Sequence, residues 1–280
     1  MEIGVNVPNF GPGTDPGRLR DWARTVEGLG YDLLMVSDHV AITPDVAGQY
    51  PAPFYEPFTA LSWLAGVTEK VKLGTTVLIA PYRHPLLVAR MAANLNQLSG
   101  GRFVLGVGSG WAKQEFEALG VDFTQRGRLT DELLRAVRDA WENDADYRSG
   151  DIPIWVGGLS TAGMRRAVRL GDAWHPLRQS MEWMRNGLDQ LAKIAENEQR
   201  ALPAFTPRIL LRLTPEPLTD RVAGEGSIDQ VIGDLEELRT LGAVAVVLDP
   251  FIGDPAETER PETAWHALAT VRAHLGTEKK

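Results

Sequence analysis

The feature that most constrains the fold is a pair of apolar runs, residues 71–79 and 103–107, that flank a segment with helical spacing. Neither run alternates apolar with polar residues, which is typical of strands buried on both faces of a parallel sheet. Pro85 suits the first turn of the helix between them, where its missing N–H costs nothing. The pattern predicts a strand–helix–strand crossover whose strands lead into Thr75-Thr76 and Gly108-Ser109-Gly110. In parallel α/β folds, such strand ends carry the ligand site.

Similar runs recur along the chain, and a helical segment follows each of them. We expect eight strands, at residues 4–8, 32–36, 71–77, 103–107, 152–156, 172–175, 208–213 and 244–248. Strands that alternate with helices imply a parallel sheet, and eight such units in about 250 residues have the size of a (β/α)₈ TIM barrel. No linker or low-complexity tract divides the chain, so a single domain over residues 1–280 is predicted. A doubly wound open sheet is the alternative.

Composition narrows the classes of partner. The formal net charge of −8 argues against nucleic acid and anionic membrane surfaces as main partners. The absence of cysteine excludes disulfides and thiolate catalysis, and the other histidines form no close-spaced ligand set with His39, so no metal is predicted. No signal peptide is visible and no apolar run reaches 18 residues. We therefore expect a soluble, cytoplasmic protein that acts on a small molecule.

Asp38-His39 follows the second predicted strand. His39 could donate or accept a proton near neutral pH, and the alternative is a histidine that only hydrogen-bonds a loop carbonyl. The next loop carries prolines at 44, 51, 53 and 57, and a loop of this length is usually functional or lid-like. Of the eight tryptophans, only Trp111 is expected outside the packing core, because it lies in a strand-end loop.

Two glycine-rich turns follow the fourth and fifth predicted strands. Gly106-Val107-Gly108-Ser109-Gly110 is G-x-G-x-G rather than G-x-G-x-x-G and does not follow the first strand, so we reject a Rossmann dinucleotide site. This turn either lets a flat ligand approach the backbone, with Ser109 supplying a hydroxyl, or is a tight turn without a ligand. The second turn, Gly157-Gly158-Leu159-Ser160-Thr161, leads into a helix N-terminus that suits a phosphate. Arg165 and Arg166, one turn further on, are expected to be solvated.

Five segments together resemble a known family. They are, in order, VSDHV, EPFTALSWLAGVTEKVKLGTTVLIAPYRHP, LSGGRFVLGVGSGWAKQEFEALGVDF, IPIWVGG and LGDAWHP. They are similar to segments of the coenzyme F420-dependent oxidoreductases within the bacterial luciferase-like monooxygenase superfamily. The resemblance implies a (β/α)₈ barrel, usually a homodimer, that holds a deazaflavin or a flavin at the carboxyl ends of its strands.

The resemblance also implies roles for individual residues. Asp38 and His39 match the family's pair beside the deazaflavin ring, and Thr76-Val77 matches a bulge with a non-proline cis peptide behind that ring. Ile79 matches a residue that contacts the ring system. The residues matching those around the cofactor's side chain and phosphate are Ser109, Gly110, Gln114, Gly157, Gly158 and Ser160.

Two departures from the family qualify this correspondence. Trp111 stands where the glucose-6-phosphate-oxidising branch has a glutamate that acts as proton partner, which argues against that substrate. The connection from Asn143 to Pro153 is shorter than in many relatives.

The sequence thus indicates an F420-dependent oxidoreductase that moves a hydride between a deazaflavin and a small organic substrate. His39 is the expected proton donor or ring-polarising group. One alternative is an FMN-dependent monooxygenase on the same fold. The other is a non-catalytic barrel that has lost its cofactor.

Overall fold

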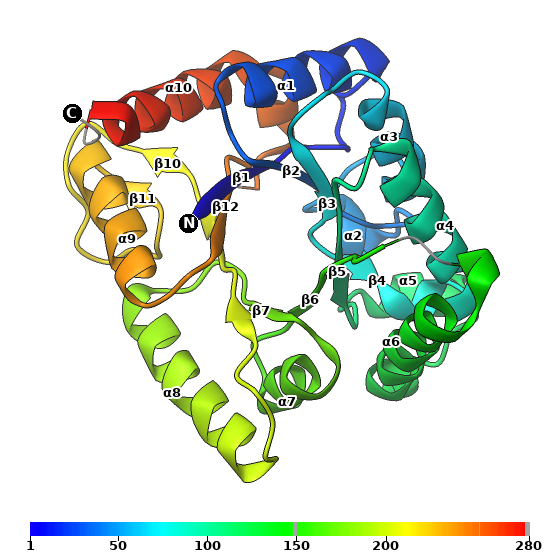
Figure 1. Ribbon diagram of the computed structural model, residues 1–280. Helices are drawn as coiled ribbons and strands as arrows, with labels where there is room; N and C mark the ends of the chain where they lie inside the picture. Colours follow the sequence, from blue (N-terminus) through cyan, green and yellow to red (C-terminus); the bar gives the residue numbers. More distant parts are fainter. Residues whose placement is uncertain (148–149, 252, 278–280) are drawn as a thin grey trace.

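A parallel sheet curls around the centre of the molecule, and the helices lie outside it (Figure 1). The computed structural model describes residues 1–147, 150–251 and 253–277. The sheet runs in the order β8-β7-β6-β5-β3-β2-β1-β12-β9, and β4 pairs with β5. Its strands are β1 (Glu2–Asn6), β2 (Leu33–Val36), β3 (Lys72–Thr75), β4 (Leu78–Ile79), β5 (Phe103–Gly108), β6 (Ile154–Gly157), β7 (Ala173–His175), β8 (Ala204–Phe205), β9 (Arg208–Leu210) and β12 (Ala245–Asp249).

The segment 204–210, which contains β8 and β9, contacts strands from both ends of this order. β8 pairs with β7 and β9 pairs with β12, all in parallel. Isolated parallel bridges join Phe205 to Ala243 and Leu177 to Arg208. The curled parallel sheet predicted from the apolar runs is therefore present.

The seventh predicted strand, 208–213, is wrong as a continuous element. It divides into β9 in the main sheet and β10 (Arg212–Leu213), which pairs with β11 (Glu225–Gly226) in a separate two-stranded sheet. The division follows Leu211, whose N–H donates to Asp249 at the end of β12. The next N–H, of Arg212, donates to Gly224 instead, so the chain leaves the main sheet at this point.

Ten helices and four short 3₁₀ turns connect the strands in the described part of the chain. The helices are α1 (Pro16–Gly28), α2 (Pro44–Ala47), α3 (Pro57–Ala65), α4 (Pro85–Leu98), α5 (Lys113–Ala118), α6 (Arg126–Asn143), α7 (Thr161–Leu170), α8 (Met181–Asn197), α9 (Ile228–Thr240) and α10 (Pro261–Thr277). The turns are η1 (Ala80–Tyr82), η2 (Phe123–Gln125), η3 (Ala145–Tyr147) and η4 (Pro255–Glu259).

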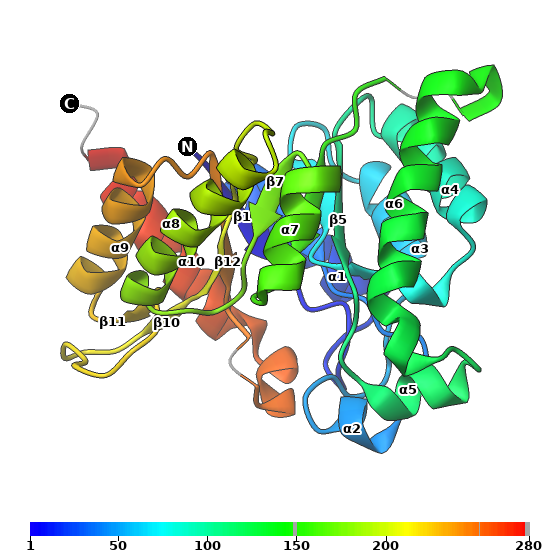
Figure 2. The same ribbon diagram turned by 90° about the horizontal axis from the view of Figure 1, so that it is seen from below.

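Local signals explain where these helices begin. Asp15 accepts a hydrogen bond from the Arg18 N–H ahead of Pro16, and Ser227 forms a capping box with Gln230. The polar loop expected after Trp111 contains one helix that was not predicted, α5. α2 and α5 pack together beyond one end of the sheet (Figure 2).

Apolar side chains fill both faces of the sheet. The large outer cluster packs the helices on the strands, and burial of each Leu or Val there is worth roughly 1.5–3 kcal/mol. The smaller inner cluster consists of Leu33, Met35, Val104, Trp155, Ala173, Ala245 and Val247. These residues fill the interior of the sheet, as in other barrels of this kind, so a ligand site is expected at the carboxyl ends of the strands.

Two further expectations concern the chain outside the sheet. Within the described ranges, no helix has both the length and the apolar composition needed to cross a bilayer. The connection from Asn143 to Pro153 lies partly outside the described residues.

Candidate active site

A cavity of about 620 Å³ opens at the carboxyl ends of the strands. Its walls come from the ends of β2, β3, β5, β6, β7 and β9 and from the N-terminal turns of α6 and α7. The predicted site residues that line it are Asp38, His39, Thr76, Val77, Ile79, Ser109, Gly110, Gly157, Gly158 and Ser160. Residues from four separate stretches of sequence therefore meet in one place.

Gln114 differs from the expectation, because it does not line the cavity. α5 turns Glu115 and Phe116 inward, and Gln114 is left exposed on the other side of this short helix. Its backbone N–H donates to Asp45 Oδ2 at 3.0 Å, which ties α5 to α2.

The wall of the cavity between β3 and β4 is a backbone bulge at Thr76-Val77. The peptide bond between these residues is cis, as the resemblance implied. Val77 projects toward two neighbouring strands that carry glycine at the contact. A Cβ on Gly108 would lie 2.5 Å from Val77 Cγ2, and one on Gly157 would lie 3.2 Å from Val77 Cγ1. Glycine is required at Gly108 in particular, because any side chain there would displace the bulge.

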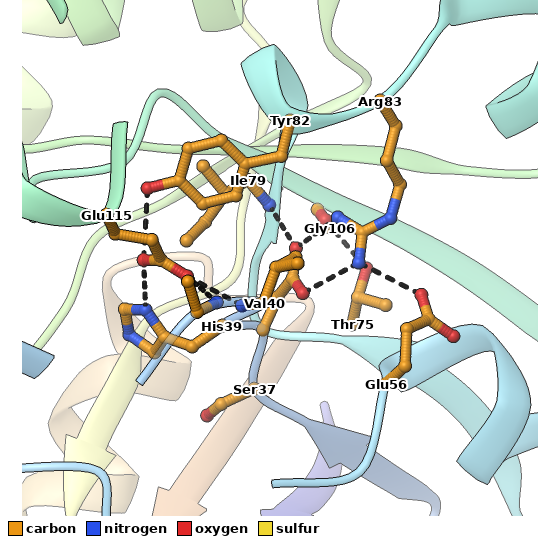
Figure 3. A network of polar contacts seen from close by, with 12 residues as sticks. Ser37, His39, Val40, Glu56, Thr75, Ile79, Tyr82, Arg83, Gly106 and Glu115 are labelled. Carbon is orange, nitrogen blue, oxygen red and sulfur yellow. Dashed lines mark hydrogen bonds and ion pairs between the residues drawn. The ribbon is translucent and has the colours of Figure 1, made fainter. Parts of the chain in front are cut away.

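A buried carboxylate lies directly behind His39 (Figure 3). Glu115 Oε2 is 2.7 Å from His39 Nδ1 and accepts a hydrogen bond from the Tyr82 hydroxyl at 3.0 Å. Glu115 Oε1 accepts from the backbone N–H groups of Val40 and Ala41 at 2.6 and 3.1 Å. The carboxylate has no exposed surface, so these four donors replace its water.

This arrangement determines the tautomer of His39. Burial raises the pKa of Glu115, but the hydrogen bonds from His39 and from the backbone outweigh burial and hold it below its ordinary value. An ionised carboxylate can only accept, so His39 Nδ1 carries a proton and donates it. Among the residues that the structure describes, none is a hydrogen-bond partner of Nε2, which therefore remains for a ligand.

Asp38 has a structural role beside this dyad. Its carboxylate receives two hydrogen bonds from Arg83, at 2.6 and 2.9 Å, and one from the Ile79 N–H at 2.8 Å. Arg83 also contacts Glu56 at 2.9 Å. Burial raises the pKa of Asp38, and the bidentate contact with Arg83 opposes that rise. These contacts fix the end of β2 against the start of η1.

A second polar network forms the floor of the cavity. His175 Nδ1 donates to the Thr206 carbonyl, so its Nε2 accepts from the Thr76 hydroxyl at 2.9 Å. Arg208 donates to the Thr76 carbonyl at 2.6 Å and pairs with Asp249 at 2.7 Å. Burial lowers the pKa of His175 to about 4, so this imidazole is neutral at physiological pH. The network supports the bulge from below.

The other end of the cavity is cationic. Ser160 caps α7 by accepting from the Gly163 N–H at 3.2 Å, and Arg126 and Arg166 line the cavity close by. The expectation that Arg166 is solvated is wrong, because Asp131 and the Gly127 carbonyl of α6 hold its guanidinium. Arg165 is exposed as expected.

Sequence reasoning missed Glu115, Arg83 and Arg208. Glu115 had no predicted role, and its only signal is that it and the apolar Phe116 lie on one side of the short helix α5. Arg83 carried no signal beyond its place just before His84-Pro85. Arg208 begins a predicted strand, where a buried arginine requires a partner that only the folded chain brings near.

The lining fits a flat cofactor with a phosphate-bearing side chain. Glycines at Gly108 and Gly157 keep the strand ends bare beside the bulge, and the α7 N-terminus with two arginines suits an anionic group. Ser37, which also lines the cavity, has a buried hydroxyl without a hydrogen-bond partner in the described part of the chain. An unsatisfied buried hydroxyl is expected where a ligand completes the site.

The fold places a cavity at the ends of parallel strands, which is where α/β enzymes of this architecture bind their ligands. The chain belongs to the luciferase-like monooxygenase family, whose sequence pattern matches residues 1–216. Relatives in this family are F420- or flavin-dependent oxidoreductases and monooxygenases.

Individual relatives differ in cofactor. An uncharacterised protein of Mycobacterium tuberculosis is 32% identical over 180 residues, 54% of this chain and 62% of that protein. The F420-dependent glucose-6-phosphate dehydrogenase of Amycolatopsis mediterranei is 33% identical, over 57% of this chain and 53% of the enzyme. The FMNH₂-dependent dimethylsulfone monooxygenase of Pseudomonas fluorescens is 27% identical, over 75% and 65%. The chain spans less than two thirds of the length of each of these relatives.

A solved structure shares the fold over almost the whole chain. An F420-dependent secondary alcohol dehydrogenase with an F420–acetone adduct matches with a TM-score of 0.76 at 17% identity, over 96% of this chain and 99% of that one.

Proposed function

We propose that this protein is an F420-dependent oxidoreductase that transfers a hydride between a deazaflavin and a small organic substrate. The proposal includes a closed (β/α)₈ barrel formed by residues 1–280 as one domain. The bridges of segment 204–210 to β7 and to Ala243, just before β12, support closure. The F420-dependent relative at 33% identity supports the choice of cofactor.

Different parts of the cavity would hold the ring and the phosphate of such a cofactor. The ring would lie against the Thr76-Val77 bulge, with Ile79 and the bare glycines at its edges. The phosphate would lie at the α7 N-terminus, near Ser160, Gly158 and Arg166. When bound, the deazaflavin supplies or accepts the hydride, and the protein supplies orientation and a dry wall.

His39 then acts on the proton that accompanies the hydride. Nδ1 is held by Glu115, so Nε2 gains or loses the proton at the cavity surface. The Glu115 carboxylate stabilises the imidazolium that forms when Nε2 is protonated. The proposal rests on the buried His39–Glu115 pair beside a cavity whose bulge, glycines and α7 N-terminus suit a flat cofactor with a phosphate.

The decisive experiment is a titration of the protein with F420 and, separately, with FMN. Binding of F420 with a dissociation constant at least tenfold lower than that of FMN supports the proposal. His39→Asn keeps a donor near Nδ1 but cannot deliver a proton near pH 7, so turnover should fall about 10²–10⁴-fold while cofactor affinity stays within about threefold. Turnover of His39→Asn at the wild-type rate across pH 5 to 8 would refute the acid–base role.

An FMN-dependent monooxygenase is the second candidate. The FMNH₂-dependent relative aligns with 75% of this chain, a larger share than the F420-dependent one. Tighter binding of FMN, with rapid reoxidation of the reduced complex in air, would favour this function. Flat titrations with both cofactors would instead indicate a barrel that has lost its cofactor.

A further inference from the structure

The end of the cavity around His39 differs in chemistry from the cationic end. Three aromatic rings surround the imidazole: Tyr50 with centroids 5.0 Å apart, Phe54 at 5.6 Å and Trp111 at 5.7 Å. Tyr50 lies at a shallow angle of 34° to the imidazole, whereas the other two rings meet it nearly at right angles. Tyr50 and Trp111 also line the cavity, so this end of it has an aromatic, largely apolar wall.

Trp111 is available to a ligand on this wall. Its side chain lines the cavity and is 48% exposed, although the ring contacts His39. Leu177 also lines the cavity and is partly exposed. Large apolar side chains that line a cavity without being covered are typical of the surface that receives an apolar ligand.

Tyr50 adds one polar group to this wall. It lines the cavity and is only 8% exposed. In the described ranges its hydroxyl has no hydrogen-bond partner, and the same is true of His39 Nε2. Because Tyr50 lines the cavity and its hydroxyl is not among the fully buried unpartnered atoms, this hydroxyl can donate to an oxygen atom of a bound ligand.

Charge at this end disfavours an anionic ligand. The guanidinium groups among the described lining residues belong to Arg126, Arg166 and Arg208. Arg208 is engaged by Asp249 and the Thr76 carbonyl, Arg166 by Asp131 and the Gly127 carbonyl, and Arg126 lies over the Phe123 ring. Arg178, the guanidinium that acts electrostatically on Tyr50, is paired with Asp249. Behind His39, Glu115 adds a negative charge whose four hydrogen bonds leave it no role in binding a cation.

We propose that the His39 end of the cavity binds a neutral, flat, apolar molecule that carries one carbonyl or hydroxyl oxygen. The body of the ligand lies against Trp111, and the oxygen receives the hydrogen bond of the Tyr50 hydroxyl beside His39 Nε2. This inference deepens the proposed function, because it names the class of substrate that the oxidoreductase site accepts.

The test uses 2-acetylnaphthalene as the neutral probe and 2-naphthoate as its anionic match. Calorimetry is performed on the full chain, both cofactor-free and saturated with F420. We expect the ketone to bind at least tenfold more tightly than the carboxylate. Tyr50→Phe, which removes only the hydroxyl, should weaken ketone binding about 2- to 12-fold, the range given by 0.5–1.5 kcal/mol per hydrogen bond.

Two further variants locate the site. Trp111→Ala should weaken ketone binding at least tenfold, whereas Leu202→Ala, an exposed residue that does not line the cavity, should leave it unchanged. Thermal unfolding of each variant verifies that it is folded. Equal affinity for the two probes, or ketone binding that is insensitive to Tyr50→Phe and to Trp111→Ala, overturns the inference.

The outcomes also separate this inference from the proposed function. Failure of F420 and FMN to bind, with Tyr50-dependent binding of the ketone to the cofactor-free chain, overturns the function and supports the inference. If the cofactor binds normally but ketone binding does not depend on Tyr50, the proposed function is supported and this inference is overturned.

Discussion

The carboxylate of Glu115 lies 2.7 Å from Nδ1 of His39, although 76 positions separate the two residues in the chain. The carboxylate is fully buried, and its other oxygen is held by two backbone N–H groups of the loop that follows His39. Glu115 therefore sets both the tautomer of the imidazole and the path of the loop.

Glu115→Gln tests the first of these effects. The amide no longer requires a proton on Nδ1, so we expect turnover to fall roughly 10–100-fold, as for outer partners of catalytic histidines. Cofactor affinity should stay within about threefold. Nitrogen NMR of His39 should show a change in tautomer. The control is Glu117→Gln, an exposed neighbour in α5 paired only with Lys113, which should behave as wild type. An unchanged imidazole spectrum in Glu115→Gln would contradict this role.

The same variant has a pH signature in stability. The pKa of Glu115 is lowered in the folded protein, so its ionisation adds stability above its ordinary pKa and that stability disappears as the pH falls through the folded value. At pH 7, Glu115→Gln should lower the free energy of unfolding by about 1.5–3 kcal/mol. Urea unfolding at pH 7 and pH 3.5 should show the difference shrinking at the lower pH.

Gly108→Ala should disturb the Thr76-Val77 bulge, against which the cofactor ring is proposed to lie. The new Cβ would lie 2.5 Å from Val77 Cγ2, so the bulge must shift, at a cost of about 1–3 kcal/mol in the free energy of unfolding. Cofactor affinity should also fall, whereas Gly28→Ala, with no atom within 4 Å of its Cβ, should stabilise the protein by up to about 1 kcal/mol. If the two variants have the same free energy of unfolding and the same cofactor affinity, the Thr76-Val77 bulge is not the surface that supports the cofactor ring.

His175 should make the protein sensitive to mild acid. Its pKa is lowered to about 4 by burial, so the unfolded chain binds this proton more readily than the folded one. Stability should therefore fall as the pH drops from 6.5 toward 4, by about 3 kcal/mol at 1.36 kcal/mol per pKa unit. His175→Asn should have a lower stability at pH 7 but a smaller decrease toward pH 4. Exposed His266→Asn is the control, and its slope should match that of the wild type.

Much of this fold could be predicted because its signals are local. The buried runs of β1, β2, β3, β5 and β12 and the caps of the helices follow from adjacent residues. The two-residue strands β8, β10 and β11 are too short to leave a period, and their pairing depends on distant partners. β8 and β11 were therefore not predicted, and β10 was predicted only as part of a longer strand, 208–213.

The candidate site shows the same division. The family's pattern located His39, the Thr76-Val77 bulge and the glycine turns, but it could not tell which side of α5 faces inward. Gln114, assigned from the resemblance, therefore faces away from the cavity, and Glu115 faces it. Arg166 was expected to be solvated, but its contact with Asp131 exists only once α6 packs beside α7.

The resemblance also implied a homodimer, and we expect the paired helices α3 and α4 to form its interface. They expose Trp63, Leu86 and Leu87 by 40%, 45% and 52%. Large apolar side chains exposed on two adjacent helices favour this face as the interface. Light scattering should give twice the chain mass, and Leu87→Glu should give a monomer. Leu202→Glu, equally exposed elsewhere, should leave the dimer intact, and a wild-type monomer at micromolar concentration would refute the expectation.

Groups from outside the segment between His39 and α3 hold it at several points, three of which involve residues around the site. Glu115 holds Val40 and Ala41, the Gln114 N–H holds Asp45, and Arg83 holds Glu56. Of the residues between Asp45 and Glu56, Tyr50 lines the cavity beside His39, and Phe54 contacts the His39 ring; neither belongs to the Thr76-Val77 bulge, the glycine turns or the α7 end. If the proposed function holds, mutations in this stretch should alter substrate preference while leaving cofactor binding unchanged. The substrate-contacting loop would then vary independently of the strand ends that hold the cofactor.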